Sequence, residues 1–280
     1  MPTYEYLTNP ALIYDRPGRG FPDEPRAPLV LIHDGGGTTF SYHLLNPIGR
    51  PLWGIENARL HDGGWWEGGI RQMAEHYVEL LAKILPEGGD ILLGGWSLGG
   101  HLSLEMAHQI AVANRKSGGK STSARPKFNV LGMIMVDTVF PLRLQDMRGP
   151  LPTEPVFLSA EESKTIKLKD KVNLNMTHAR MMIRSWEIPE WKDGLTVPPT
   201  ILLRAKEFVS RDPSQTFVDY VREFRLLGWD EYNEENGTFI KKVEDVEGHH
   251  FSIFEPKNLD AVSKKISDAA YELDPLEFES

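Results

Sequence analysis

Short apolar runs alternate with longer amphipathic segments along most of the chain. Runs rich in Val, Leu and Ile occupy residues 29–33, 91–94, 130–136 and 200–203. Continuous apolar runs of this length are typical of parallel strands that are buried on both faces. The alternation therefore predicts an α/β domain in which helices cover both faces of a mostly parallel sheet.

Helical spacing of apolar residues marks the segments between these strands. In residues 70–84 the apolar positions recur three or four residues apart, and residues 98–112 continue as a second predicted helix. Residues 239–246 have the composition of a strand, and Ala261, Ile266 and Ala270 indicate a last helix that packs on the sheet.

Residues 140–197 interrupt this alternation, because roughly 60 residues are too many for a simple connection. They include apolar residues at helical spacing, namely Val172, Met176, Ala179, Ile183 and Trp186. We expect the segment to form a helical lid over an active site. A Met-rich helix that merely completes the core is the alternative interpretation.

A second interruption, at residues 114–127, carries five basic and no acidic residues and is rich in Gly and Ser. This composition predicts a surface loop. Its Gly119-Lys120-Ser121 is similar to the end of a phosphate-binding loop, but Asn114 stands where that motif requires glycine. Nucleotide binding is therefore rejected.

Composition narrows the possible partners and compartments. The chain has 280 residues, 40% of them apolar, a formal net charge of −9 and no cysteine. We expect one domain over residues 1–280 with the lid inserted at 140–197. The acidic balance disfavours nucleic acid, and the lack of cysteine excludes disulfides, thiolate nucleophiles and thiolate zinc sites. No apolar run reaches the roughly 20 residues of a membrane span, and no signal peptide is evident, so we expect a cytoplasmic protein without a membrane partner.

The strongest chemical signal is Gly95-Trp96-Ser97-Leu98-Gly99, between a predicted strand and a predicted helix. A sharp strand-to-helix turn forces its central residue into strained backbone angles and lifts the side chain clear of the sheet. Flanking glycines relieve the clashes, and the amides that begin the helix point to the same place. The motif predicts an α/β-hydrolase fold with Ser97 as nucleophile, rather than a glycine-rich turn with an idle serine.

A serine nucleophile requires a base that a carboxylate orients, and both are expected after Ser97 in the chain. The base is expected in Gly248-His249-His250-Phe251, and the other seven histidines have positions that favour structural roles. For the carboxylate, Asp137 ends a predicted strand at the edge from which Ser97 emerges. Asp212, which follows the next strand, is the alternative.

A glycine-rich loop, His33-Asp34-Gly35-Gly36-Gly37-Thr38, follows the first clear strand. Consecutive glycines let backbone amides approach a reacting carbonyl, so we expect the amides of Gly35 and Leu98 to bind the oxyanion. A metal site at His33 and Asp34 is disfavoured, because adjacent side chains on one loop rarely converge on an ion without further ligands.

The motifs together resemble the thioesterase domains that end polyketide synthases and non-ribosomal peptide synthetases. The likeness covers nearly the whole chain and rests on the serine motif, on Val136-Asp137-Thr138 with Pro141 close behind, on the histidine motif, on residues 51–55 and on Leu227-Gly228-Trp229. In that family the carboxylate often follows the strand after the nucleophile helix, and the histidine stands in a Gly-x-His pattern. The resemblance thus favours Asp137 over Asp212 and His250 over His249.

Two departures from the family pattern accompany this likeness. The 40 residues from Ser97 to Asp137 exceed the expected separation, and the basic segment at 114–127 would account for the excess. Asp34 stands where the family more usually has proline after histidine, which weakens the assignment of the oxyanion donor at Gly35.

The resemblance implies a two-step release of an acyl chain without a cofactor or metal of the enzyme's own. A polyketide or peptide held as a thioester on the phosphopantetheine of an acyl or peptidyl carrier protein would pass to Ser97, with His250 as general base and Asp137 orienting it. Water would then give an acid, an internal hydroxyl or amine a ring, and a carbon nucleophile a condensed product.

Other functions remain open at this stage. A carboxylesterase or lipase that acts on oxygen esters uses the same triad, and a receptor or scaffold could keep the fold and motifs. The basic segment at 114–127 is a candidate docking surface for an acidic carrier protein, with a solvated loop as the alternative.

Overall fold

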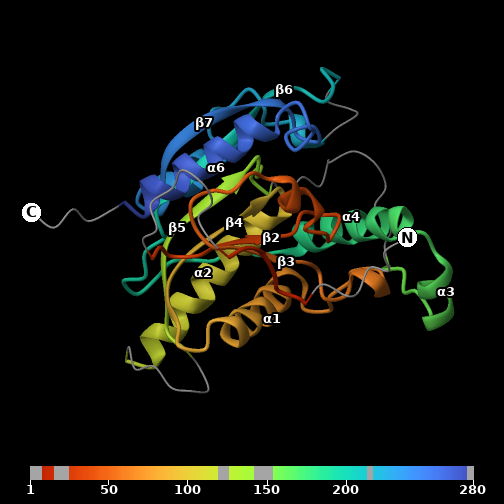
Figure 1. Cartoon of the computed structure of the whole chain (residues 1–280), viewed down its shortest axis with the longest axis horizontal. Coiled ribbons are helices and arrows are strands. Elements are labelled where there is room, and N and C mark those ends of the chain that lie inside the picture. The colour runs from red at the N-terminus through yellow and green to blue at the C-terminus, as the bar shows by residue number, and fades with distance from the viewer. Residues whose placement is uncertain (1–7, 16–24, 119–125, 142–153, 213–216, 276–280) are drawn as a thin grey trace, which may run out of the picture.

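A seven-stranded sheet in the order β1-β3-β2-β4-β5-β6-β7 forms the centre of the molecule (Figure 1). The computed structural model describes residues 8–15, 25–118, 126–141, 154–212 and 217–275. The strands are β1 (Ala11–Tyr14), β2 (Leu29–Ile32), β3 (Leu52–Ile55), β4 (Gly89–Trp96), β5 (Phe128–Val136), β6 (Thr200–Glu207) and β7 (Ile240–His249). β1 pairs antiparallel with β3, and the other neighbours are parallel. The predicted mostly parallel sheet is confirmed.

Helices cover both faces of this sheet. α1 (Gly69–Ile84) and α2 (Leu98–Lys116) pack on one face, and α6 (Leu259–Leu273) packs on the other (Figure 1). Consecutive strand residues serve opposite cores, so that Val30 packs on the α1 and α2 side while Leu31 packs on the α6 side. This explains why the strands have continuous apolar runs instead of an alternating pattern. The short elements are η1 (Phe40–Leu44), η2 (Leu60–Asp62), η3 (Phe217–Asp219) and α5 (Asp230–Glu235).

Between β5 and β6 the chain forms α3 (Ala160–Thr165) and α4 (Leu168–Ser185), while residues 142–153 of the predicted lid lie outside the described residues. The predicted apolar stripe is confirmed in part: Ala179 and Trp186 are buried, whereas Val172, Met176 and Ile183 are half-buried. The buried residues of α4 are Lys171, Asn175, His178, Ala179 and Met182. The reason is that α4 packs against a loop at residues 57–64 whose backbone carbonyls require hydrogen-bond donors, so a largely polar face of the helix is buried.

The basic segment at 114–127 begins differently from the prediction of a loop. α2 continues to Lys116, and Asn114 Nδ2 donates to the carbonyl of Phe128 at 2.8 Å, which ties the end of the helix to β5. Residues 119–125, with the Gly119-Lys120-Ser121 motif, lie outside the described residues. β1 was not anticipated, because four residues with only partial burial give too little pattern to recognise.

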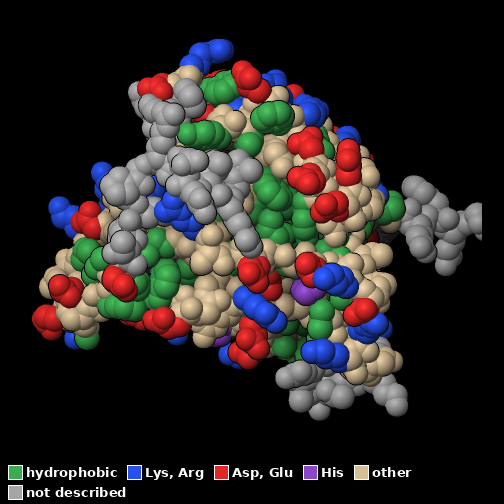
Figure 2. Space-filling model, turned by 180° about the vertical axis from the view of Figure 1, so that it is seen from behind, with side chains coloured by type: hydrophobic (Ala, Val, Ile, Leu, Met, Phe, Trp, Pro, Cys, Tyr) green, Lys and Arg blue, Asp and Glu red, His purple; other side chains and the backbone are tan. Residues whose placement is uncertain are grey.

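The charged surface carries both signs. Acidic and basic side chains are interspersed over the face seen in Figure 2. No helix within the described parts of the chain is both long enough and apolar enough to cross a membrane.

Candidate active site

Ser97 occupies the sharp turn between β4 and α2. Its backbone angles, φ 55° and ψ −113°, lie in a region that L-residues rarely adopt, and its amide donates to the carbonyl of Val136 at 2.9 Å. The turn brings the start of α2 so close to β2 that a Cβ atom on Gly99 would lie 2.2 Å from the carbonyl oxygen of Ile32. Glycine is therefore required at this position, and the strained turn presents the hydroxyl of Ser97 at the end of the sheet.

The ends of neighbouring parallel strands bring the predicted groups to one edge of the sheet. Ser97 follows β4, Asp137 follows β5, the loop containing His250 follows β7, and the glycine-rich loop follows β2. Like Ser97, Asp137 has a positive φ, 45°, so two adjacent strands end in strained polar residues. Such strain is typical of functional sites.

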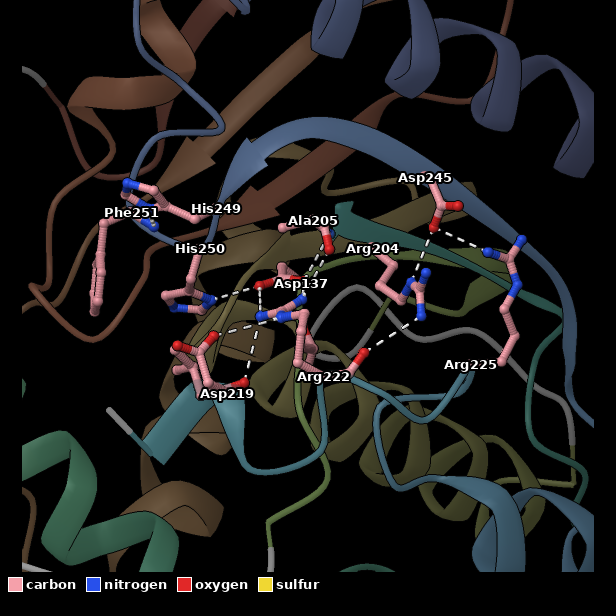
Figure 3. Close-up of polar contacts among 12 residues, drawn as sticks. Asp137, Arg204, Ala205, Asp219, Arg222, Arg225, Asp245, His249, His250 and Phe251 are labelled. Carbon is pink, nitrogen blue, oxygen red and sulfur yellow. Dashed lines mark hydrogen bonds and ion pairs between the residues drawn. The ribbon is translucent and has the colours of Figure 1, made fainter. Parts of the chain in front are cut away.

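Asp137 and His250 form a buried hydrogen-bonded pair. His250 Nδ1 lies 2.7 Å from Asp137 Oδ2, and both side chains are at most 3% exposed (Figure 3). Because an ionised carboxylate can only accept, Nδ1 carries the proton and the lone pair of the neutral ring is on Nε2. This is the tautomer that a general base requires, and the ring of Trp96, next to Ser97, lies 5.6 Å from that of His250.

Four donors surround the carboxylate of Asp137. Besides His250, the amide of Ala205 donates to Oδ1 at 2.8 Å, and the guanidinium of Arg222 donates to both oxygens, to Oδ2 at 2.6 Å. Burial alone raises the pKa of Asp137, but the hydrogen bonds from His250 and Arg222 outweigh burial and hold that pKa well below its ordinary value. The carboxylate therefore stays ionised at neutral pH.

The structure places the alternative residues elsewhere. Asp212 is exposed, whereas Asp137 is fully buried against His250. The ring of His249 accepts a hydrogen bond from the amide of Phe251 through Nδ1 at 3.3 Å and does not contact Asp137 within the described part of the chain. The arrangement therefore brings together Asp137 and His250 and leaves Asp212 and His249 apart.

The glycine-rich loop is held from within. The amides of Gly36 and Gly37 donate to Asp34, at Oδ1 and at the carbonyl respectively, both at 3.0 Å. Among the described residues, no protein group accepts from the amide of Gly35. Leu98 is the first residue of α2, where helical amides have no acceptor within the helix. Within the described parts of the chain, the two amides predicted to bind an oxyanion thus have no hydrogen-bond acceptor.

Two titratable side chains support this loop. His33 Nδ1 donates to the carbonyl of Asp34, and the hydroxyl of Tyr77 donates to Nε2 at 2.7 Å. Burial lowers the pKa of His33 to about 4, so the ring is neutral and has no free nitrogen for catalysis. Burial raises the pKa of the Asp34 carboxyl to about 6, partly offset by the Gly36 amide and by nearby His250.

Sequence reasoning missed Arg222 and its neighbour Asp219. They lie in and after η3, outside any recognised motif, although Leu227-Gly228-Trp229 was singled out a few residues later. That short stretch packs beside the end of β5, since the indole of Trp229 donates to the carbonyl of Thr138 at 2.8 Å. Within the described residues, no group of three or more His, Asp or Glu side chains could hold a metal ion.

Comparison with known proteins adds independent findings. The model of the thioesterase domain family matches residues 27–270. The thioesterase frbE of Dothideomycetidae sp. (strain 11243) is 41% identical over 271 residues, which cover 96% of this chain and 97% of that protein. The non-ribosomal peptide synthetase imqB of Aspergillus flavus is 31% identical over 279 residues, which cover 86% of this chain and 8% of that protein. Among solved structures, the NocB thioesterase domain in a covalent complex with a fluorophosphonate nocardicin G analogue is 23% identical, with a TM-score of 0.57 over 88% of this chain and 94% of that chain.

Proposed function

This chain belongs to the thioesterase domain family, and from this premise we propose that Ser97, His250 and Asp137 are its catalytic triad. The observation that carries the proposal is the buried hydrogen bond between His250 Nδ1 and Asp137 Oδ2, at the sheet edge where the strained turn presents Ser97. The arrangement supplies a base whose ring a carboxylate orients, at the same sheet edge as a serine that the backbone presents.

In the first step the hydroxyl oxygen of Ser97 attacks the carbonyl carbon of a thioester while its proton passes to His250 Nε2. The oxyanion of the tetrahedral intermediate accepts hydrogen bonds from the amides of Gly35 and Leu98. When the carbon–sulfur bond breaks, His250 returns the proton to the leaving sulfur. The products of this step are a thiol and an ester on Ser97.

In the second step a nucleophile attacks the carbonyl carbon of the ester on Ser97 and gives its proton to His250. The bond between that carbon and the Ser97 oxygen then breaks, and His250 returns the proton to the oxygen, which restores the serine hydroxyl. Water yields a free acid, an internal hydroxyl or amine yields a ring, and a carbon nucleophile yields a condensed product. Asp137 stays ionised throughout and stabilises the imidazolium that forms in each step.

The substrate that we propose is an acyl chain, polyketide or peptide, carried as a thioester on the phosphopantetheine arm of an acyl or peptidyl carrier protein. The similarity to part of a non-ribosomal peptide synthetase supports this proposal, because such synthetases hold their products on carrier domains. The enzyme itself then needs no cofactor. We also propose that residues 1–280 act as one catalytic domain.

Residues 140–197 act as the lid of this domain, with α4 as the wall above the glycine-rich loop. A Cβ atom on Gly35 would lie 3.6 Å from Cβ of Ala179, and one on Gly36 would lie 2.9 Å from Val172 Cγ1. Even small side chains in the loop would therefore collide with α4 or touch it. Any acyl chain that reaches the proposed oxyanion donors must pass beside this helix.

Buried polar groups fasten α4 to the loop at residues 57–64. His178 Nδ1 donates to the carbonyl of Gly63 at 2.6 Å, and Nε2 accepts from the amide of Val156 at 3.0 Å. Asn175 accepts from Asn57 Nδ2 at 2.9 Å and donates to the carbonyl of Leu60 at 3.1 Å. These hydrogen bonds hold α4 in one position against the loop and support a lid of defined shape.

The deciding experiment compares hydrolysis of an acyl thioester with that of the matched oxygen ester by the wild type and Ser97→Ala. A preference for the thioester that disappears in Ser97→Ala supports the proposal. A preference for the oxygen ester would instead favour a carboxylesterase, and activity that survives in Ser97→Ala would refute the assignment of the nucleophile. A fluorophosphonate probe should label the wild type at Ser97 and leave Ser97→Ala unlabelled.

A further inference from the structure

Arg222 holds the carboxylate of Asp137 at both oxygens, one of which also bonds to His250. Its two terminal nitrogens donate to the two carboxylate oxygens, and both side chains are at most 1% exposed (Figure 3). A planar guanidinium that bonds both oxygens fixes the rotation of the carboxylate as well as its position. His250 donates to one of these same oxygens, so the direction of its hydrogen bond depends on how Arg222 holds Asp137.

The guanidinium of Arg222 is itself held by the backbone around it. One terminal nitrogen also donates to the carbonyl of Ala205 at 3.2 Å, and the other to the carbonyl of Val218 at 3.3 Å. Arg204 donates to the backbone carbonyl of Arg222 at 3.4 Å. β6 and the η3 segment therefore set the position of the group that orients Asp137.

Asp219 supplies a second negative charge behind Arg222. Its Oδ1 lies 3.7 Å from Arg222 Nε, while its Oδ2 accepts from the amide of Ser210 at 2.8 Å. Arg222 Nε and Asp219 Oδ1 are both buried, and neither has a hydrogen-bond partner among the described residues. Their interaction is thus an ion pair without a hydrogen bond. It places a negative charge near Arg222 but forms no part of the two hydrogen bonds that hold Asp137.

We propose that Arg222 is a positioning residue of the catalytic triad, which fixes both oxygens of Asp137 and, balanced by Asp219, sets the charge that the Asp137–His250 pair experiences. The proposal rests on the proposed function. It makes the site a buried cluster of alternating charge, in which the cation of Arg222 bonds the carboxylate that must stabilise the imidazolium of His250.

The pH profile should report this arrangement. Among the described residues, the charged and titratable groups around the pair are Asp219 of η3, Arg222 just after it and Asp34 from the loop after β2. A cation near a titrating pair disfavours its protonation, and an anion favours it. Removing the charge of Arg222 should therefore move the acidic limb of kcat/KM to higher pH, and removing that of Asp219 should move it to lower pH.

The test measures kcat, KM and the pH dependence of kcat/KM for a short acyl N-acetylcysteamine thioester. Arg222→Met is expected to raise the acidic limb by about 1 to 3 pH units. It should also lower kcat by about 10- to 100-fold with little change in KM, because the triad loses its geometry. Asp219→Asn is expected to lower the acidic limb by less. Arg222→Lys keeps the charge without the two-point grip, so its limb should stay near that of the wild type while kcat falls.

Arg225→Met is the matched control. Arg225 lies three positions along the same segment and bonds Asp245 at 2.9 Å, with its side chain 54% exposed. Loss of this surface cation should leave the acidic limb in place. If Arg225→Met shifts the acidic limb as much as Arg222→Met does, the effect comes from a general disturbance of this stretch of chain, and the proposal is overturned.

Opposite shifts in Arg222→Met and Asp219→Asn support the proposal, and coincident profiles of these two variants and the wild type overturn it. If Arg222→Met does not fold, the direction of the shift in Asp219→Asn decides alone, because the asparagine keeps an acceptor for the amide of Ser210. Failure of the proposed function gives a different result, because the wild type would then prefer the oxygen ester to the thioester or Ser97→Ala would keep the wild-type activity, whatever the pH profiles of the Arg222 and Asp219 variants.

Discussion

Replacing Asp137 by asparagine should destabilise this protein as well as inactivate it. The carboxylate accepts from four donors, two at each oxygen, which come from His250, Ala205 and both terminal nitrogens of Arg222. An amide nitrogen placed at either oxygen position would face two of these donors. Rotating the asparagine only exchanges one pair of opposed donors for the other.

The size of the effect follows from the burial of Arg222. With asparagine at position 137, its guanidinium would lose the carboxylate charge and one of its two bonds to that side chain, and would keep one bond to the amide oxygen, the ion pair with Asp219 at 3.7 Å and two backbone carbonyls. Removing one partner of a buried ion pair costs about 3 to 5 kcal/mol. Loss of the carboxylate should also lower kcat by about 10⁴-fold, because the imidazole loses its orientation and correct tautomer.

Urea unfolding at pH 7 measures this loss of stability, with Asp212→Asn as the control at an exposed aspartate. The double variant Asp137→Asn, Arg222→Met should regain part of the lost stability while staying inactive, because the unpaired guanidinium is removed and the buried charge that remains, on Asp219, still accepts from the amide of Ser210. If Asp137→Asn unfolds within about 1 kcal/mol of the wild type, or if the second substitution destabilises it further, then the buried charge of Arg222 does not depend on Asp137 as we reason.

Three other outcomes are expected. Because burial raises the pKa of Asp34 to about 6, Asp34→Asn should stabilise the fold by at most about 3 kcal/mol at pH 7.5 and by about half as much at pH 5. Equal gains at both pH values in urea titrations would contradict this. Burial lowers the pKa of His33 and of His101 to about 4, so the Asp34→Asn variant, in which protonation of Asp34 cannot offset the effect, should lose about 3 kcal/mol per histidine as pH falls from 6.5 to 4. Unfolding free energies measured across that range should be nearly flat if the reasoning is wrong. Asn175→Leu removes the bonds to Asn57 and Leu60 and should speed hydrogen exchange in α4 by about tenfold or more, leaving α6 unchanged as the internal reference.

The parts of the fold that could be predicted from the sequence are those in which the surroundings of an element restrict the residue types within that element. A strand buried on both faces needs a continuous apolar run, and the runs that became β2, β4, β5 and β6 were recognised for this reason. The turn at Ser97 was recognised because steric crowding between β4 and α2 demands glycine at fixed positions. β1 escaped prediction, since a four-residue edge strand is buried too little to leave such a record.

α4 shows how the same reasoning fails when the neighbouring surface is backbone. The apolar stripe through Val172 and Ile183 predicted which side of the helix would be buried, yet these two residues are only half-buried, and the polar Asn175 and His178 are as deeply buried as the apolar Ala179 and Met182. A core made of side chains selects apolar partners, whereas a loop with unpaired carbonyls selects donors. The periodicity of hydrophobic residues reveals only packing against an apolar core, and not hydrogen bonding to a loop.

Arg222 could not be predicted for a related reason. Its role depends on contacts with Asp137, 85 positions earlier in the chain, and with Ala205 in β6. No local sequence pattern distinguishes it from a surface arginine. The carboxylate itself offered an indirect signal, because a buried aspartate that serves one histidine still has acceptor positions that need donors. Once a catalytic carboxylate is predicted, the residues that donate the remaining hydrogen bonds to its oxygens should therefore be sought as well. In this protein the donor with the greatest consequence is a cation, so the charge of the triad depends on a residue outside it.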